Sequence, residues 1–390
     1  MRHVPRLLAE EIRRASRAFP VVILTGPRRA GKTYLLRRCF PRASYHLLED
    51  PDVTARVQSD PRGFLDEAGT PAILDEIQYV PELLNYIRSR ADRLGSHSLR
   101  WIITGSQEAG LMRGVTESMA GRAAIFQLLP LSAAESPKVT VVHGGFPEAL
   151  ASPATAGTWY RSYIQTYLER DVRGISSIRN LATFRRFLAL LASRAGQVLN
   201  RTEIAGPLGV SIPTVSEWIG ILETTMQIIL VHPFYENLGK RLIKSPKVYF
   251  MDSGLLCHLL GIGTETELMK STFAGPVFEG FVAAEIVKAQ INSGNRREVY
   301  FFRDRQGLEV DFLVPTAGRR IVLMEAKASR SVRPEAAGPM TRLLRSLGRY
   351  KTDAFVVGPR SASGPGISTL APGVRAITTD SIGSALYGKQ

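Results

Sequence analysis

The segment GPRRAGKT, residues 26 to 33, constrains this chain more than any other feature. It fits the pattern G-x-x-x-x-G-K-[ST], with Gly26, Gly31, Lys32 and Thr33 at the four defined positions. The apolar run VVILT precedes it, and a helical pattern begins near Lys32. Glycines let such a loop curl so that its backbone N–H groups point at phosphate, and the following helix adds its positive N-terminus. The spacing therefore predicts a phosphate-binding loop between a strand and a helix.

A loop of this kind binds ATP with Mg²⁺ as the accompanying cofactor. Lys32 would reach the β and γ phosphates, and the hydroxyl of Thr33 would bind Mg²⁺. Arg28 and Arg29 occupy variable positions of the pattern, so they need not touch phosphate. The residues expected around the nucleotide are Gly26, Pro27, Arg28, Arg29, Ala30, Gly31, Lys32, Thr33 and Asp75.

The other half of this site is expected at ILDE, where an apolar strand ends in Asp75 and Glu76. Asp75 would hold Mg²⁺ through water, and Glu76 would polarise the attacking water. A third apolar run ends in TGSQ, where Thr104 or Ser106 could contact the γ-phosphate or the water. Arg122 would supply the positive charge that hydrolysis needs, in cis or from a neighbouring subunit, with Arg113 as the less favoured candidate.

Short apolar runs alternate with helical patterns in the first third of the chain, which predicts a parallel sheet covered on both faces. We expect its strands within residues 21–26, 71–78, 99–107 and 123–132. Residues 157–265 are mostly helical in pattern, and strand patterns return after residue 297. The predicted fold class is α/β, with a P-loop domain at 1–140, a helical and winged-helix domain at 141–270 and a second α/β domain at 271–390.

Residues 200–234 follow the order short helix, glycine-containing turn, second helix and β-rich run, which is the order of a helix-turn-helix with a wing. The second helix contains Glu217 and Glu223 and neither Lys nor Arg. Phosphate contacts would therefore come from the basic wing, at Lys240, Arg241, Lys244 and Lys247. Binding of DNA or RNA without sequence specificity and a packing role both stay open, and Trp218 is expected in the core.

Two apolar strand patterns near the C-terminus carry charged residues. LEVDFLV contains Asp311, and LMEAKAS contains Glu325 and Lys327, which the period of a strand places on one face. Glu285 or Glu279 on the preceding helix would add an oxygen ligand, and such a set suits Mg²⁺ or Mn²⁺. The pattern predicts metal-assisted phosphodiester hydrolysis, in which Lys327 orients the water. A retained fold with structural ion pairs is the open alternative.

The formal net charge is +15, and the first 40 residues hold ten basic and two acidic side chains. This balance suits a polyanionic partner, and it equally suits a surface that only favours solubility. Cys39 and Cys257 lie far apart without a metal-like spacing, so a reduced cytoplasmic compartment is expected. The Arg-rich N-terminal helix pattern lacks the apolar core of a signal peptide, and no apolar run approaches the roughly 18 residues that span a bilayer.

Seven ordered motifs together resemble a known family: GPRRAGKT, ILDEIQ, ITGSQ, AGRAAIFQLLPLS, GGFPEAL, YLERDV and GLEVDFLV. They resemble the prokaryotic AAA+-type ATPases whose C-terminal part is called domain of unknown function 4143. The resemblance runs along nearly the whole chain. It implies an AAA+-like ATPase core, a winged-helix middle and a C-terminal domain similar to the PD-(D/E)xK, restriction-endonuclease-like nucleases. The stretch from PLSAAES to GGFPEAL is shorter here than in relatives with a helical insertion.

The leading prediction is a Mg²⁺-dependent ATPase that acts on or near nucleic acid. One alternative is a nuclease whose cutting at Asp311, Glu325 and Lys327 is gated by ATP. The other is a regulatory or protein-binding switch in which the winged helix and the nuclease-like fold are scaffolds. No membrane partner is expected, and a homo-oligomer is required only if Arg122 acts on a neighbouring subunit.

Overall fold

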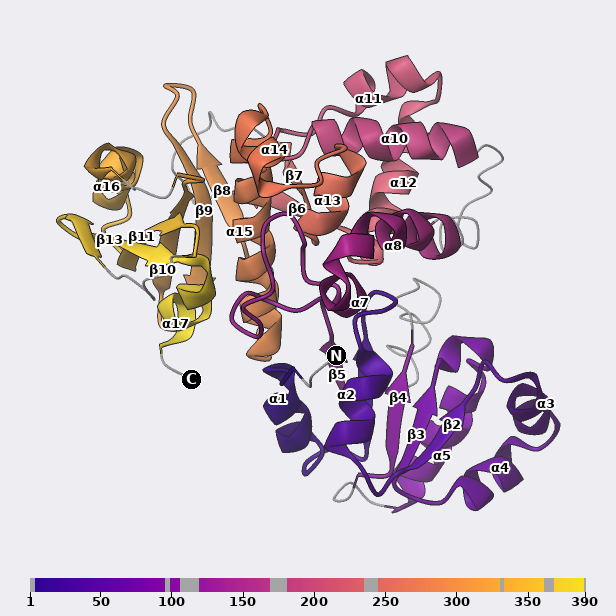
Figure 1. Cartoon of the computed structure of the whole chain (residues 1–390). Helices are drawn as coiled ribbons and strands as arrows, with labels where there is room; N and C mark the ends of the chain where they lie inside the picture. Colours follow the sequence, from indigo (N-terminus) through magenta and orange to yellow (C-terminus); the bar gives the residue numbers. More distant parts are fainter. Residues whose placement is uncertain are drawn as a thin grey trace. The chain divides into compact units, whose positions relative to one another are not determined.

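The computed structural model of the chain describes residues 4–94, 99–105, 119–168, 181–234, 245–329, 333–360 and 368–388. The fold divides into two compact units. The first consists of Met1–Pro130 with the short segments Thr224–Met226 and Ile291–Asn295, and the second consists of the remaining residues. Figure 1 draws the first unit mainly in indigo and violet and the second from magenta to yellow.

The first unit contains a five-stranded sheet in the order β2-β3-β4-β1-β5, and every neighbouring pair is parallel. Its strands are β1 (Val21–Thr25), β2 (Ser44–Leu47), β3 (Ala72–Asp75), β4 (Trp101–Thr104) and β5 (Ala123–Gln127). The predicted parallel sheet is therefore confirmed. Strand β2 was not predicted, because its four residues SYHL are all half-buried and form no apolar run.

Helices cover both faces of this sheet, as Figure 1 shows. One face packs against α1 (Leu8–Ala15) and α2 (Lys32–Cys39), and the other against α3 (Pro51–Ser59), α4 (Pro61–Ala68) and α5 (Leu83–Leu94). Successive residues of β1 alternate between the faces: Val22 and Leu24 join the α1–α2 core, and Val21 and Ile23 join the other. This double burial explains why the first four residues of β1 are all apolar.

The N-terminal half of the second unit is mainly helical. Its helices are α7 (Pro147–Ala151), α8 (Ala156–Tyr163), α10 (Leu181–Ser193), α11 (Arg201–Leu208), α12 (Ile212–Thr224), α13 (Ser253–Leu259) and α14 (Glu265–Lys270). Gly209 ends α11 with a φ of 65°, which supplies the expected turn. Trp218 is only 4% exposed and packs against the rings of Phe184 and Phe187, so its predicted core position is confirmed.

An eight-stranded mixed sheet organises the rest of the second unit, in the order β12-β13-β11-β10-β9-β8-β6-β7. The strands are β6 (Ile228–Pro233), β7 (Lys247–Phe250), β8 (Tyr300–Arg303), β9 (Glu309–Thr316), β10 (Arg320–Ala326), β11 (Lys351–Gly358), β12 (Ser368–Ala371) and β13 (Val374–Thr378). Helices α15 (Ala274–Asn292), α16 (Gly338–Ser346) and α17 (Ile382–Tyr387) accompany them. The predicted α/β class, with a helical middle part and a C-terminal α/β part, is confirmed.

The expected wing hairpin belongs to this sheet. Strands β6 and β7 pair antiparallel, and β6 pairs in parallel with β8 through His232 and Tyr300. Strands from both sides of residue 270 therefore belong to one sheet. The domain limits near 140 and 270 stay predictions. This pairing brings β7 into the same sheet as the C-terminal carboxylates on β9 and β10.

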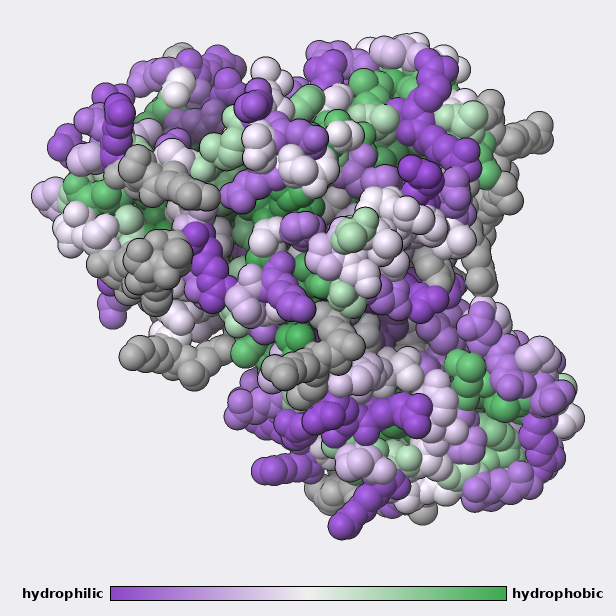
Figure 2. Space-filling model, in the orientation of Figure 1, coloured by the Kyte–Doolittle hydropathy of each residue, from purple (hydrophilic) through white to green (hydrophobic). Residues whose placement is uncertain are grey.

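The visible surface of both units is mostly hydrophilic, with apolar residues in small groups (Figure 2). The large apolar side chains with substantial exposure come from different segments: Leu7, Tyr34, Ile125, Ile212 and Met269. Within the described ranges, no helix has both the length and the apolar character needed to cross a bilayer.

Candidate functional site

The loop between β1 and α2 has the backbone conformation that its glycines predict. Gly26 has a φ of 137° and Gly31 a φ of 97°, both in the region that favours glycine. A Cβ at Gly26 would lie 2.2 Å from the carbonyl oxygen of Leu128. Gly26 therefore permits close approach of the segment after β5, and Gly31 permits the turn into α2.

Lys32 lies against this loop at the start of α2 and is 5% exposed. Its ammonium donates hydrogen bonds to the carbonyl oxygens of Gly26 at 3.1 Å and Pro27 at 3.2 Å. These acceptors hold the side chain folded over the loop, with its charge beside the backbone expected to surround phosphate.

Thr33 and Asp75 lie in direct contact, with the Thr33 hydroxyl donating to Asp75 Oδ2 at 2.7 Å. The Tyr45 hydroxyl donates to the same oxygen at 2.7 Å, and the Thr104 hydroxyl donates to Asp75 Oδ1. Burial and then the hydrogen bond to Asp75 raise the pKa of Tyr45 above its usual range. Three hydroxyl groups thus hold a carboxylate that is 2% exposed at the end of β3.

Glu76 follows Asp75 with a φ of 61°, a left-handed conformation that is unusual for glutamate. Its backbone N–H donates to the Thr104 hydroxyl at 3.0 Å, and its carboxylate accepts a hydrogen bond from the Gln78 amide. Thr104 therefore connects Asp75 and Glu76, a role that was not predicted. Ser106 and Arg113 lie outside the described residues.

Arg122 lies at the opposite edge of the sheet from the loop. It directly precedes β5, which runs parallel to β1 with Ala123 beside Val21, whereas the loop follows Thr25 at the other end of β1. A strand of this length places the two edges roughly 15 Å apart. The Arg122 guanidinium forms an ion pair with Asp92 there. The expectation that Arg122 could act in cis is therefore wrong, and only action on a neighbouring copy stays open.

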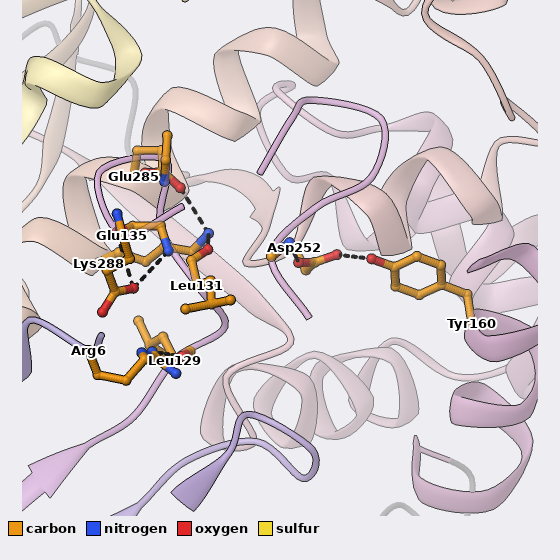
Figure 3. A network of polar contacts seen from close by, with 11 residues as sticks. Arg6, Leu129, Leu131, Glu135, Tyr160, Asp252, Glu285 and Lys288 are labelled. Atoms are coloured by element: carbon orange, nitrogen blue, oxygen red, sulfur yellow. Dashed lines mark hydrogen bonds and ion pairs between the residues drawn. The ribbon is translucent and has the colours of Figure 1, made fainter. Parts of the chain in front are cut away.

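Arg6, which was not predicted, contacts the loop from the segment before α1. Its guanidinium donates to the carbonyl oxygen of Ala30 at 3.0 Å and to that of Leu129 at 2.6 Å. Figure 3 shows Arg6 beside Leu129. The side chain thereby ties the loop to the segment that leaves β5. Arg6 is one of ten basic residues among the first 40, and no spacing distinguishes it from the others.

The predicted C-terminal residues Asp311, Glu325 and Lys327 come together as expected. Strands β9 and β10 are antiparallel with Phe312 opposite Met324, so the next residues along, Asp311 and Glu325, are neighbours. The Ala326 N–H donates to Asp311 Oδ2 at 2.9 Å, and the Lys327 ammonium pairs with Glu325 Oε1 at 2.8 Å. Burial, followed by the nearby carboxylates of Glu279 and Glu325, raises the pKa of Asp311 well above its ordinary value. Burial also raises the pKa of Glu325.

The helical carboxylate of this cluster is Glu279 and not Glu285, so the expectation of Glu285 as a metal ligand is wrong. Glu285 pairs with Lys288 at 2.9 Å and accepts a hydrogen bond from the Ala133 N–H at 2.8 Å. Lys288 also donates to the Leu131 carbonyl oxygen at 3.0 Å, as Figure 3 shows. Six residues separate Glu279 from Glu285, which in a helix is about one and two-thirds turns, so they face different sides.

Lys247 is another correction, because it does not serve as a basic wing residue. It is 4% exposed on β7, and its ammonium binds Glu279 at 2.9 Å and Glu309 at 2.7 Å. The carboxylates around Lys247, led by Glu279, raise its pKa despite its burial. A buried, doubly paired lysine cannot reach a phosphate backbone. The other predicted wing residues, Lys240, Arg241 and Lys244, lie outside the described ranges.

The two candidate sites differ in their fit to a divalent cation. At the loop, the Thr33 hydroxyl and the Asp75 carboxylate are adjacent and offer the oxygen donors that Mg²⁺ prefers. In the C-terminal cluster, the carboxylates are already paired with lysine ammonium groups or a backbone N–H. Among the described residues, no three His, Cys, Asp or Glu side chains are arranged to hold a metal ion. The C-terminal residues therefore do not fit a resident metal in this arrangement.

Comparison with known proteins divides the chain among three families. An AAA domain matches residues 18–136, a domain of unknown function (DUF8612) matches residues 135–266, and a domain of unknown function (DUF4143) matches residues 274–364. Among solved structures, the Walker-type ATPase PABY2304 of Pyrococcus abyssi is 17% identical with a TM-score of 0.44, over 65% of this chain and 94% of that one.

Two curated relatives cover most of the chain. The uncharacterized protein Rv2008c of Mycobacterium tuberculosis and the uncharacterized protein Mb2031c of Mycobacterium bovis are each 32% identical over 320 residues, which is 80% of this chain and 71% of each relative. The chain belongs to the prokaryotic AAA+-type P-loop ATPase family with a C-terminal domain of unknown function 4143.

Proposed function

We propose that this chain hydrolyses ATP in a Mg²⁺-dependent reaction at Lys32, Thr33, Asp75 and Glu76. The observation that carries the proposal is the 2.7 Å hydrogen bond between Thr33 and Asp75, which lie 42 positions apart in the sequence. These are the two side chains expected to hold Mg²⁺, and Mg²⁺ would neutralise charge on the β- and γ-phosphates. Membership of an AAA-type ATPase family also supports the proposal that the chain hydrolyses ATP.

The loop and α2 bind the phosphates in this proposal. The backbone N–H groups of the loop and the N-terminus of α2 offer donors and positive potential. Lys32 now donates to the carbonyl oxygens of Gly26 and Pro27, and it would exchange these bonds for stronger ones to phosphate oxygens. The carbonyl bonds hold the ammonium ready beside the site, so little reorganisation is needed.

Glu76 is the proposed general base, which accepts a proton from the attacking water. Its backbone is held in the left-handed conformation, with its N–H bonded to the Thr104 hydroxyl at 3.0 Å. Since the same hydroxyl also bonds to Asp75, Thr104 positions the general base relative to the Mg²⁺ ligand. Strained backbone of this kind is often maintained where it orients a reacting group.

Calorimetric titration with ATP and Mg²⁺ tests the assignment of the site. Lys32→Ala should lose about 3–6 kcal/mol of binding free energy, because two charge-assisted hydrogen bonds to phosphate disappear. Arg28→Ala is the matched control, since it removes a cation from a variable position of the same loop. Normal ATP affinity in Lys32→Ala would show that the nucleotide binds elsewhere.

We further propose that the ATPase acts on nucleic acid without sequence specificity. The net charge of +15 supports this, as does a pocket between α4 and α5 with a volume of about 240 Å³. The pocket is lined by Arg62, Asn85, Tyr86, Ser89, Arg90 and Arg93, and of its three arginines Arg90 forms an ion pair with Asp66 at 2.7 Å. Arginine clusters of this kind bind phosphate groups.

Salt dependence separates this proposal from a protein-binding switch. Binding of labelled single-stranded or duplex oligonucleotides should weaken steeply between about 50 and 200 mM salt. The double variant Arg62→Ala/Arg93→Ala should bind more weakly, with a shallower slope, while its ATP turnover without nucleic acid is unchanged. Absence of measurable oligonucleotide binding at low salt would favour the switch instead. We do not extend the proposal to cleavage at Asp311, Glu325 and Lys327, because these residues do not fit a metal ion as they are paired.

A further inference from the structure

Lys247 lies beside the carboxylates of Glu279, Glu309 and Asp311, and Glu325 adjoins Asp311 in the same cluster. Glu279 is on α15, Glu309 and Asp311 are on β9, and Glu325 is on β10. The Lys247 ammonium lies 2.9 Å from Glu279 Oε1 and 2.7 Å from Glu309 Oε1. Tyr249, two residues further along β7 and so on the same face, donates its hydroxyl to Glu279. One atom of Lys247 thus joins α15 to β9.

The charges of this cluster are largely balanced by the protein itself. Lys327 pairs with Glu325 at 2.8 Å, and Arg303 approaches Glu309 at 3.5 Å. Together with Lys247, three cationic side chains face four carboxylates. A divalent cation would need the oxygens that Lys247 already binds, because Glu279 and Glu309 converge on its ammonium.

The Lys247 ammonium has little freedom to move out of the carboxylate cluster. Its side chain is 5% exposed, and its ammonium lies 5.5 Å from the centre of the Phe301 ring. The neighbouring residues on β7, Val248 and Tyr249, are fully buried. Moving an ammonium out of two ion pairs across apolar surroundings costs far more than rotating an exposed lysine. Lys247 therefore behaves as a fixed part of the cluster.

We propose that Lys247 occupies the cation position of this carboxylate cluster, so that the wild-type chain holds α15, β7, β9 and β10 together without a divalent metal. Replacing the ammonium by an apolar group of similar length leaves uncompensated carboxylates around the vacated position. Such a variant becomes a site for Mn²⁺ or Mg²⁺ at the same place. This inference is independent of the proposed ATPase activity.

Thermal unfolding of the full chain with and without Mn²⁺, in the absence of nucleotide, tests the proposal. Every variant carries Asp75→Asn, so that Mn²⁺ at the nucleotide site does not contribute. Mn²⁺ should leave unchanged the Tm of the protein that keeps lysine at position 247. It should raise the Tm of Lys247→Met by roughly 2 °C or more. The rise should disappear in Lys247→Met/Asp311→Asn, and Lys247→Arg, which keeps the charge, should show none.

Two results would overturn the proposal. In one, the Lys247 chain itself is stabilised by Mn²⁺ and Asp311→Asn removes that effect, which means that a metal binds beside the lysine. In the other, Lys247→Met is folded and gains no Mn²⁺ response. If Lys247→Met does not fold, Lys247→Met/Glu279→Gln supplies the test, since it removes one charge of each sign. The double variant should then recover folding, and failure to recover it also rejects the proposal.

Discussion

Thr33 donates a 2.7 Å hydrogen bond to Asp75, and this contact joins the first turn of α2, which follows β1, to the end of β3, a strand that is not a neighbour of β1 in the sheet. Strand β4 lies between β3 and β1, and Thr104 at its end bonds to the same carboxylate. Because all three strands are parallel, their carboxyl ends meet at one edge. The nucleotide site is therefore a consequence of strand order and direction.

Gly26→Ala tests the close approach of the loop to the segment after β5. Alanine is strained at a φ of 137°, and its Cβ would lie 2.2 Å from the Leu128 carbonyl oxygen. We expect a loss of about 2 kcal/mol or more in the free energy of unfolding, together with weaker ATP binding. Gly220→Ala, in the exposed middle of α12 where nothing lies near the added carbon, should instead stabilise by about 0.5–1 kcal/mol. Equal effects in urea unfolding would contradict this account.

Arg6→Ala tests whether the segment before α1 shapes the nucleotide site. The guanidinium fixes the carbonyl groups of Ala30 and Leu129, so its loss should loosen the loop. We expect the KM for ATP to rise about ten-fold with little change in kcat, which corresponds to about 1.4 kcal/mol of binding. Arg13→Ala, on the exposed side of α1, is the control. A fall in kcat at unchanged KM would assign Arg6 a different role.

Asp311→Asn tests the raised pKa of the carboxylate pair. A carboxyl group whose folded-state pKa is raised contributes stability at low pH, and this contribution is lost as the pH rises through the folded value. Asparagine cannot ionise and can still accept the Ala326 N–H bond. The variant should therefore gain stability relative to wild type as the pH rises above about 4, the ordinary pKa of an aspartate, measured by denaturant unfolding. A difference that does not change with pH would mean that Asp311 is not perturbed.

Arg122→Ala tests the corrected position of this residue. Arg122 lies at the far edge of the sheet and pairs with Asp92, so the variant should bind ATP within about two-fold of wild type at protein concentrations that keep the chain monomeric. If Arg122 serves a neighbouring copy, wild-type turnover per chain rises with protein concentration and the variant lacks this rise. A large loss of ATP affinity in the monomer would place Arg122 at the site after all.

Most of the core of the first unit was predictable because β1, β3 and β4 are buried along their whole length and mainly apolar. Strands β1, β3, β4 and β5 and the start of α2 all lie within their predicted ranges. Strand β2 was missed because its four half-buried residues lack an apolar run. The position of Arg122 was open to prediction as well, since a residue before a parallel strand lies at the amino edge, away from the loop.

The C-terminal cluster was only partly predictable. Alternation along β10 and the pairing with β9 brought Asp311, Glu325 and Lys327 together. The helical period alone could not show whether Glu279 or Glu285 joins the carboxylate cluster, because α15 is largely buried and shows no polar face. Lys247 was assigned to a wing by its basic neighbours, and only the pairing of β6 with β8 reveals that β7 joins the C-terminal sheet.

ATP turnover by wild type and Glu76→Gln, with Mg²⁺ present, tests the central claim most directly. Glutamine keeps the shape of Glu76 and its amide carbonyl, but it cannot accept a proton from the attacking water. We predict that the variant binds ATP as wild type does, in a parallel calorimetric titration, while its rate of phosphate release falls by about 10²–10⁴-fold. Turnover of Glu76→Gln within a few-fold of wild type, or no Mg²⁺-dependent turnover by wild type itself, would contradict the account.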